Sequence, residues 1–247
     1  MELKVYPSKD AMSKAAADLV VAQVQKKANS ILCFPSGESP LIVLEYLVKY
    51  GKEKVVDFDR CHFVGLDEWI GMNENDEGSC KHFMYSKFFK LLNIREEQIV
   101  FFDGMAADLD EECQKMDAYI KDNGPIDLIM VGLGMNGHIG LNEPGTDFKL
   151  YAHQAELDPI TVEVAQKYFQ KSTELSGGIT LGLQHLMEAK MAVLIVSGGK
   201  KSGILKEVLT NSVTNEIPGT IVQSHANAYV LVDEDAASKL DRSSSFF

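Results

Sequence analysis

The sequence contains few arginines and few cysteines for its length. Of the 247 residues, the arginines are Arg60, Arg95 and Arg242 alone. An anion site between Arg95 and Arg242 would therefore rely on lysine, polar side chains and backbone amides. The four cysteines show no C-x-x-C or metal-like spacing, and a chain of this size buries about 70–75% of its unfolded surface without disulfides. We expect free thiols and no metal site.

Long hydrophobic runs are also missing. No apolar stretch reaches 18 residues, the minimum for a membrane-spanning helix. The first ten residues, MELKVYPSKD, lack the basic end and apolar run of a signal peptide. We therefore expect a cytoplasmic protein without a membrane partner.

Acidic residues outnumber basic ones by 36 to 24, and the net charge is −12. Nucleic-acid binding depends on neutralising many phosphates, so this charge argues against a nucleic-acid partner. It does not exclude one phosphorylated small molecule, provided that positive charge gathers locally. Between Lys149 and Lys206 seven lysines face five acidic residues, so this stretch is positive within an acidic chain. For any single lysine, a solvated surface position is the simpler interpretation.

The composition is that of an ordinary globular protein, with 45% apolar and 24% charged residues. Short apolar runs bounded by turn residues predict buried strands. These runs are Ile31–Phe34, His62–Leu66, Ile99–Phe102, Ile126–Gly132, Ala192–Val196 and Tyr229–Val232. Segments of helical period lie between them. They are Ala11–Lys27, Leu41–Tyr50, His82–Leu92, Glu112–Ile120, Thr180–Met187 and Ser202–Leu209.

Strands that are apolar on both faces and alternate with helices indicate an α/β fold with a mainly parallel sheet covered on both sides. No linker divides the chain, so we expect one domain over residues 1–247. Residues 144–178 break the pattern, being polar and ending near the Gly177-Gly178 pair. A mobile lid and a plain surface loop both fit this segment. The last five residues, SSSFF, are expected to fray.

In parallel sheets, ligands collect beyond the carboxyl ends of the strands, so the loops there are informative. The first predicted strand runs into Ser36, Gly37, Glu38 and Ser39, followed by a helix. A glycine, two hydroxyls and helix N-terminal amides can bind phosphate. A plain turn, with Ser39 as the N-cap and proline as the first helical residue, fits as well. The nucleotide fingerprints G-x-x-x-x-G-K-[ST] and G-x-G-x-x-G are absent here, which disfavours a generic nucleotide-binding protein.

The fourth predicted strand leads into the most informative motif, GLGMNGHIGLNEPG, at residues 132–145. Its glycines and proline shape the loop tightly around His138, with Asn136 and Glu143 nearby. A histidine oriented by a carboxylate is a general acid–base unit.

Two more strand ends carry charged groups. Asp67 and Glu68 follow the second strand directly, ahead of the single Trp69. A shielded carboxylate there can have a raised pKa and act as a base, although a turn cap is an equal alternative. Lys200 and Lys201 follow the fifth strand at a helix start, where the helix dipole disfavours cations. That misfit favours an anionic ligand.

In this order, the motifs SGESP, GLDEWIGM, GLGMNGHIGLNEPG and SGGKK resemble the glucosamine-6-phosphate deaminase/isomerase family. The family includes galactosamine-6-phosphate enzymes and, more distantly, 6-phosphogluconolactonases. The resemblance extends from the first predicted strand to Val232. Residues 139–145 match the deaminase side rather than the lactonases. The resemblance implies a Rossmann-like three-layer α/β/α enzyme that acts on a sugar phosphate without metal or redox cofactor. A homo-oligomer is compatible with it, because the family includes monomers and hexamers.

The resemblance also implies roles for the acid–base residues. Asp67 resembles the base that moves a proton between C2 and C1 of the sugar. His138 resembles the residue that opens the sugar ring, and Glu143 resembles the carboxylate that partners this histidine. Asn136 lies where many members have Asp, a loss of charge that should leave His138 less biased toward its protonated form.

For the phosphate group, Ser36, Gly37 and Ser39 fall on the family's binding loop, and Lys201 falls on its phosphate-binding lysine. Glu38 departs from the usual Ser, and a carboxylate beside a phosphate is repulsive unless it points away or binds a sugar hydroxyl. Lys167 stands near the place of the family's lid Arg, and offers a point charge instead of a bidentate clamp. With LDEW in place of the more usual MDEY, these departures favour galactosamine-6-phosphate over glucosamine-6-phosphate as the substrate.

Two other functions remain open at this point. A lactone hydrolase would use His138 to activate water. A non-catalytic sugar-phosphate sensor would resemble bacterial regulators that carry a helix-turn-helix ahead of this domain. We expect no room for such a motif, because the first predicted strand begins by Ile31.

Overall fold

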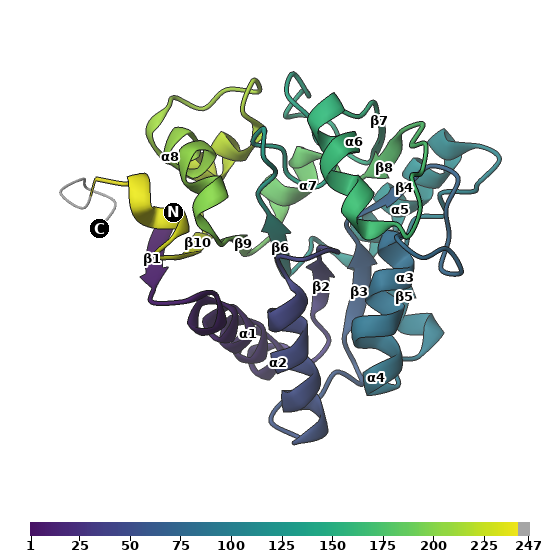
Figure 1. The fold of residues 1–247 in the computed structure, drawn as a ribbon. Helices are drawn as coiled ribbons and strands as arrows, with labels where there is room; N and C mark the ends of the chain where they lie inside the picture. The colour runs from purple at the N-terminus through teal and green to yellow at the C-terminus, as the bar shows by residue number, and fades with distance from the viewer. Residues whose placement is uncertain (242–247) are drawn as a thin grey trace.

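In the computed structural model, which describes residues 1–241, seven parallel strands form one sheet in the order β1-β10-β9-β6-β2-β3-β5 (Figure 1). Every neighbouring pair is parallel. The strands are β1 (Glu2–Tyr6), β2 (Ile31–Phe34), β3 (His62–Gly65), β5 (Ile99–Val100), β6 (Leu128–Gly132), β9 (Ala192–Val196) and β10 (Ala228–Asp233). The tail SSSFF and Arg242 lie outside the described residues.

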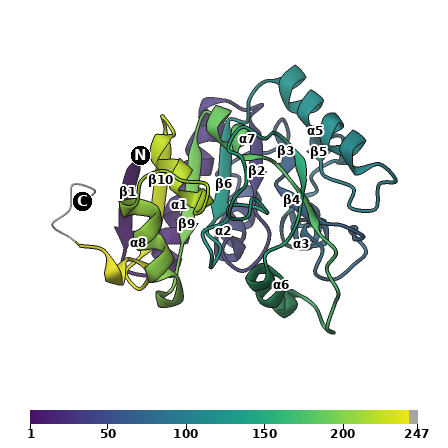
Figure 2. The same cartoon turned by 90° about the horizontal axis from the view of Figure 1, so that it is seen from above.

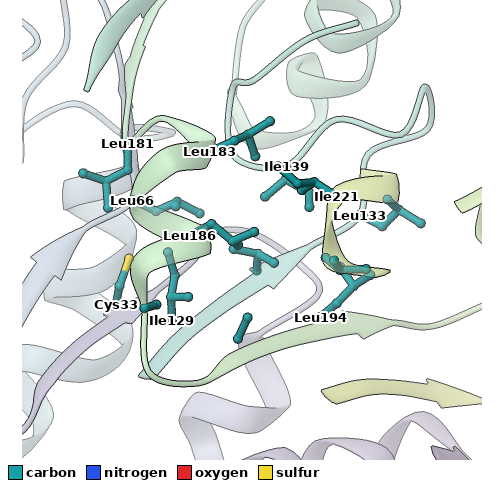
Figure 3. Close-up of a cluster of buried hydrophobic side chains, with 14 of the residues drawn as sticks. Cys33, Leu66, Ile129, Leu133, Ile139, Leu181, Leu183, Leu186, Leu194 and Ile221 are labelled. Carbon is teal, nitrogen blue, oxygen red and sulfur yellow. The ribbon is translucent and has the colours of Figure 1, made fainter. Parts of the chain in front are cut away.

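Helices cover both faces of this sheet. One face packs against α1 (Lys9–Lys26), α2 (Leu41–Lys52) and the helical stretch α3 (Cys80–Met84), π-helical turn (Tyr85–Phe89) and α4 (Lys90–Leu92). The other face packs against α5 (Leu109–Asn123), α7 (Leu183–Glu188) and α8 (Ser202–Thr210). Figure 3 shows part of the second core, where side chains of α7 meet those of β6 and β9. The predicted three-layer α/β/α architecture is confirmed.

Most predicted elements are present, and the structure also contains elements that were not predicted. Strand β1 was not predicted, because it lies at the sheet edge and Glu2 and Lys4 face solvent. The helix predicted to begin at Thr180 begins at Leu183, so the prediction of its first turn is wrong. The preceding residues form β8 (Gly178–Thr180) in a small antiparallel sheet, ordered β4 (Asp67–Trp69), β8 and β7 (His153–Ala155).

The segment 144–178 is not a plain loop. It contributes β7 to the small sheet and carries α6 (Pro159–Ala165) with one further turn, Gln166–Tyr168. Asp158 caps α6, since its side chain accepts a hydrogen bond from the Ile160 amide at 2.8 Å, and Pro159 occupies the first helical position. In Figure 2, α6 lies apart from α5 and α7. A single domain over residues 1–247 with this segment as its lid stays a prediction.

The topology gathers the informative loops. The loops after β9, β6, β2 and β3 follow four neighbouring strands at the middle of the sheet. Since these strands are parallel, all four loops leave from the same edge, which is where α/β proteins place their sites.

Among the described residues, no helix is both long and apolar enough to cross a membrane.

Candidate active site

His138 lies in the loop after β6 and is held by a polar network. Its Nδ1 lies 3.2 Å from Oε2 of Glu143, and Asn136 donates its amide to the same oxygen at 2.8 Å. The side-chain amide oxygen of Asn136 accepts from the His138 backbone amide at 3.2 Å. Because an ionised carboxylate can only accept, this network assigns the neutral ring's proton to Nδ1. The lone pair on Nε2 is then available for acid–base work.

The pKa of Glu143 is lower than its ordinary value. The side chain is buried, with the residue 7% exposed, and burial by itself would raise the pKa. Hydrogen bonds and charge from His138, with hydrogen bonds from Thr161 and Asn136, outweigh that effect. The second carboxylate oxygen, Oε1, is buried and has no hydrogen-bond partner among the described residues. Glu143 is therefore an anion at neutral pH that orients the imidazole through Oε2 alone.

The glycines of this loop allow close approach to the ring. A β-carbon added to Gly134 would come within 2.4 Å of His138 Nε2, so the backbone lies directly against the imidazole. The Gly134 amide also donates to the His138 carbonyl at 2.9 Å, which closes the loop. A side chain at position 134 would displace the ring.

Asp67 is the first residue of β4 and is only 8% exposed. Burial raises the pKa of its carboxyl to about 6, and the charge of Glu68 contributes to the rise. A hydrogen bond with the Cys80 thiol and the charge of His138 act in the opposite direction. A β-carbon added to Gly140 would lie 3.6 Å from Asp67 Oδ2, so the His138 loop reaches this carboxylate. Asp67 is a buried base whose pKa lies close to physiological pH.

Glu68 differs from its neighbour, because it is fully buried and three of its four hydrogen bonds anchor β4 to the start of α3. Oε1 accepts from the Trp69 and Cys80 amides at 2.8 and 3.0 Å. Oε2 accepts from the Ser79 hydroxyl at 2.7 Å and from the Lys81 amide at 2.9 Å. Glu68 therefore supports the strand that carries Asp67, a role that the sequence pattern did not indicate.

Replacing Glu68 with Gln should destabilise the protein. The new amide group would face donors in place of one acceptor oxygen, and hydrogen bonds to a charged group contribute about 1.5–3 kcal/mol each. Burial also raises the pKa of Glu68, so loss of the charge offsets part of this cost, and we expect the free energy of unfolding, measured by urea denaturation, to fall by about 1–2 kcal/mol. Glu77→Gln, a change at an exposed neighbour, is the control and should have no measurable effect. Equal stability of the two variants would contradict the anchoring role.

The loop after β2 contains the predicted phosphate residues. Gly37 adopts a φ of +97°, and an added β-carbon would meet the Tyr168 hydroxyl at 2.8 Å, so glycine is required there. The interpretation of Ser39 as an N-cap is wrong. Pro40 holds the cap position of α2 with helical backbone angles, and no side chain caps the helix. Within the described residues the Ser39 hydroxyl forms no hydrogen bond, which leaves it available to a ligand, and Ser36 is also partly exposed.

Three lysines surround this loop. Lys201 follows β9, and its Nζ donates to the Leu133 carbonyl in the loop after β6. Burial lowers the pKa of this ammonium group to about 8; the charges of Lys167 and Lys9 act in the same direction, and the charge of Glu38 opposes them. The neighbouring Lys200 is exposed, so the structure distinguishes the two lysines of the motif.

Lys9 was missed by sequence reasoning. It is the first residue of α1, and its Nζ donates to the Glu38 carbonyl at 3.2 Å. The signal that could have found it is its place after the edge strand β1, at the same carboxyl edge as the other loops. With Lys167 and Lys201 it gives the loop three cations against one carboxylate.

Glu38 forms an exposed ion pair with Lys167, with Oε2 and Nζ 2.8 Å apart. The hydrogen bond from Lys167 lowers the pKa of the Glu38 carboxyl, and the charges of Lys9 and Lys201 add to this effect. The Lys167 ammonium also lies 5.1 Å from the ring centre of Tyr168. Segment 144–178 therefore touches the phosphate loop through Lys167 and Tyr168.

A cavity of about 330 Å³ opens beside the phosphate loop, between it and α3. Ser36, Gly37, Trp69, His82 and Tyr168 are among its lining residues. Asp67, His138 and Lys201 are not among the residues that line it. In the part of the chain that the structure describes, no group of three His, Cys, Asp or Glu side chains is placed to hold a metal ion.

Comparison with known proteins gives one consistent picture. A family model described as glucosamine-6-phosphate isomerases/6-phosphogluconolactonase matches residues 7–231. Glucosamine-6-phosphate deaminase from Thermoanaerobacter pseudethanolicus is 34% identical over 239 residues, which cover 96% of this chain and 94% of that protein. The protein of the same name from Clostridioides difficile is 34% identical over 242 residues, covering 98% and 97% of the two chains.

Solved structures agree on the fold. A monomeric glucosamine-6-phosphate deaminase superposes with a TM-score of 0.93 at 27% identity, covering 96% of this chain and 99% of that one. The 6-phosphogluconolactonase from Trypanosoma brucei superposes with a TM-score of 0.76 at 15% identity, covering 97% and 98% of the two chains. The second similarity indicates the fold alone.

Proposed function

Because this chain belongs to the family of glucosamine-6-phosphate isomerases and 6-phosphogluconolactonases, and is therefore an enzyme, we propose that it deaminates and isomerises a hexosamine 6-phosphate. The products are a ketohexose 6-phosphate and ammonia. The observation that carries the proposal is the pairing of two acid–base groups at one edge of the sheet. They are a buried carboxylate, Asp67, and the imidazole of His138 held by Glu143.

The first step opens the pyranose ring. With its proton on Nδ1 and Glu143 behind it, His138 presents Nε2 to the substrate. Nε2 takes the proton of the anomeric hydroxyl, and its conjugate acid returns a proton to the ring oxygen as the C1–O5 bond breaks. An imidazole nitrogen can accept a proton and then donate it, which suits this shuttle.

The second step moves a proton between carbons. Asp67 removes the proton from C2 of the open aldehyde, giving an enolamine, and returns a proton to C1. The resulting imine at C2 is hydrolysed by water, and ammonia leaves. A base with a pKa of about 6 is ionised at neutral pH and is still strong enough to take part in proton transfer. The reaction moves protons without net oxidation or reduction, so its chemistry calls for no redox cofactor.

The phosphate end of the substrate is assigned to the loop after β2. The Ser36 and Ser39 hydroxyls, the Gly37 backbone and the ammonium groups of Lys201 and Lys167 supply donors and positive charge there. Lys9 adds a third cation, which the motif comparison did not include. The acidic chain thus carries a locally cationic pocket.

A lactone hydrolase is the second candidate in this family. The deaminase is favoured because the relatives at 34% identity are named glucosamine-6-phosphate deaminases, whereas the lactonase from T. brucei is matched at 15% identity. Residues 139–145 also follow the deaminase pattern. A lactonase needs His138 to activate water but has no step that requires a buried base such as Asp67.

The test is ammonia release from galactosamine-6-phosphate and glucosamine-6-phosphate side by side, with 6-phosphogluconolactone hydrolysis measured in parallel. We expect ammonia and a ketohexose 6-phosphate from at least one hexosamine and no accelerated lactone hydrolysis. The departures at Glu38, Trp69 and Lys167 lead us to expect galactosamine-6-phosphate as the better substrate. Lactone hydrolysis without ammonia release would establish the second candidate, and binding without turnover would indicate a sensor.

Replacing Glu38 with Gln should strengthen substrate binding. The change removes the single carboxylate paired with Lys167 beside the phosphate loop and leaves three cations unopposed. Exposed charge pairs contribute about 0.2–1 kcal/mol, so the KM should fall by about 1.5- to 5-fold at low salt, and less at high salt. Glu163→Gln, at an exposed position of α6, is the matched control. A rise in KM would mean instead that the Glu38 carboxylate binds a sugar hydroxyl.

A further inference from the structure

Thr161 of α6 contacts the acid–base pair. Its Oγ1 lies 3.1 Å from His138 Nδ1, and the residue is only 5% exposed. Its backbone is fixed as well, because its amide donates to the Asp158 carbonyl at 2.9 Å in the first turn of α6. None of the motifs in the sequence included this residue. The segment that covers the site therefore presents a buried hydroxyl to the catalytic imidazole.

The chemistry of the three groups fits one arrangement. His138 Nδ1–H donates to Glu143, which as an anion can only accept. A threonine hydroxyl carries one proton and two lone pairs, so it can donate to the Glu143 carboxylate while lying close to Nδ1–H. Glu143 Oε1 has no partner among the described residues, so the carboxylate depends on few hydrogen bonds. Each of those bonds matters for holding the imidazole in place.

The same segment reaches the phosphate loop. Six residues after Thr161, Lys167 pairs with Glu38, and Tyr168 lies over Gly37. Helix α6 continues without a break into the turn Gln166–Tyr168, so these contacts belong to one short helical arm. An arm that is seated on the phosphate loop at one end thereby brings the Thr161 hydroxyl to the acid–base pair.

We propose that Thr161 is a positioning residue that completes the His138–Glu143 pair when α6 lies over the site, and so links the seating of the phosphate end to ring opening. The proposal rests on the proposed deaminase function, because it gives the hydroxyl a task in that reaction. It predicts that the hydroxyl acts on turnover and not on substrate affinity, since Thr161 holds the imidazole and does not face the phosphate group.

The kinetic test compares Thr161→Val, which keeps the shape and removes the hydroxyl, with Thr161→Ser, which keeps the hydroxyl. We expect Val to lower kcat by about tenfold, the effect of one hydrogen bond of about 1–1.5 kcal/mol. KM and the inhibition constant of inorganic phosphate should change less than twofold, and Ser should restore most of kcat. Thr161→Ala replaces Val if the branched side chain disturbs packing. Thr173→Val is the matched control, since within residues 1–241 its hydroxyl bonds only the Lys171 carbonyl.

A second readout does not depend on turnover. The Nδ1–H signal of His138, identified in imidazole NMR spectra by its loss in His138→Gln, should exchange with water about tenfold faster in Thr161→Val than in the wild type, and Thr161→Ser should reverse this. If the wild type releases no ammonia, the proposed function fails while this measurement still decides the role of Thr161. The proposal would be overturned if the exchange rate and kcat were unchanged in Thr161→Val. It would also be overturned if Thr161→Ser and Thr173→Val lost as much kcat as Thr161→Val does.

Discussion

Replacing Asp67 with Asn should almost abolish ammonia release while leaving the fold and sugar-phosphate binding in place. Asparagine has nearly the same shape, but its amide cannot take the proton from C2. A general base contributes about 10²- to 10⁴-fold to rate, so kcat should fall by that factor. Asp59→Asn, at an exposed position that precedes β3 and so lies at the opposite end of this strand from Asp67, is the control. Turnover of Asp67→Asn within a few-fold of the wild type would contradict the role of Asp67 as the base in proton transfer.

The pH dependence of the wild type offers an independent check on the same residue. Burial raises the pKa of Asp67 to about 6, and the base must be ionised to act. We therefore expect kcat/KM to rise with pH up to about 6 and then to level off, which forms the acidic limb of the pH profile. The profile of Thr161 or Glu38 variants should keep this limb, because neither residue contacts Asp67.

The raised pKa also has a consequence for stability. A carboxyl group whose folded-state pKa lies above its unfolded value makes the folded state less stable once the group is ionised. From 3.8 to about 6, the shift corresponds to about 3 kcal/mol at pH 7, and the difference disappears as the pH falls toward 4. Asp67→Asn should thus be more stable than the wild type at pH 7, by up to about 3 kcal/mol in free energy of unfolding. A variant that gains stability while losing activity indicates that function maintains this buried charge.

The sequence predicted the elements that have a strong local signature. Strands β2, β6 and β9 lie inside the sheet and are apolar on both faces, so they appear as uninterrupted apolar runs. The edge strand β1 alternates charged and apolar residues and was missed. The small sheet was missed because its strands have three residues each and because β4 pairs with β8 across more than a hundred residues, with Asp67 opposite Thr180. Pairings of that kind have no local pattern.

The difference between local patterns and contacts of distant residues also explains which site residues were predicted. Asp67, His138 and Lys201 were found because each follows a predicted central strand, and parallel strands end at one edge. Thr161 and Lys9 were missed because their contacts with His138 and Glu38 join elements 23 and 29 residues apart. The alternative interpretation of Ser39 as an N-cap was wrong, because Pro40 holds the cap position of α2. Local sequence therefore located the site loops but not the residues that reach them from elsewhere.

Replacing Lys201 with Met should weaken substrate binding strongly. The ammonium group is the most enclosed cation beside the phosphate loop, held by the Leu133 carbonyl, and a charge acts more strongly where little water screens it. Truncating one partner of a buried, hydrogen-bonded charge pair costs about 2–5 kcal/mol, so the KM should rise by about 30-fold or more. Lys200→Met is a stringent control, because it removes the same charge at the exposed neighbour and leaves the net charge of the two variants equal.

The two lysine variants should also differ in their response to pH and salt. Since burial lowers the pKa of Lys201 to about 8, wild-type KM should begin to rise above that pH as the ammonium group loses its proton. Lys200→Met should keep this rise, and Lys201→Met should lose it, because methionine does not titrate. Added salt should raise KM more in Lys200→Met than in Lys201→Met, because the two variants have the same net charge but Lys201→Met leaves less positive charge beside the phosphate loop to screen. Equal KM values in the two variants would mean that the overall charge of the motif attracts the phosphate, and that the enclosed position of Lys201 serves only the packing of its own loop.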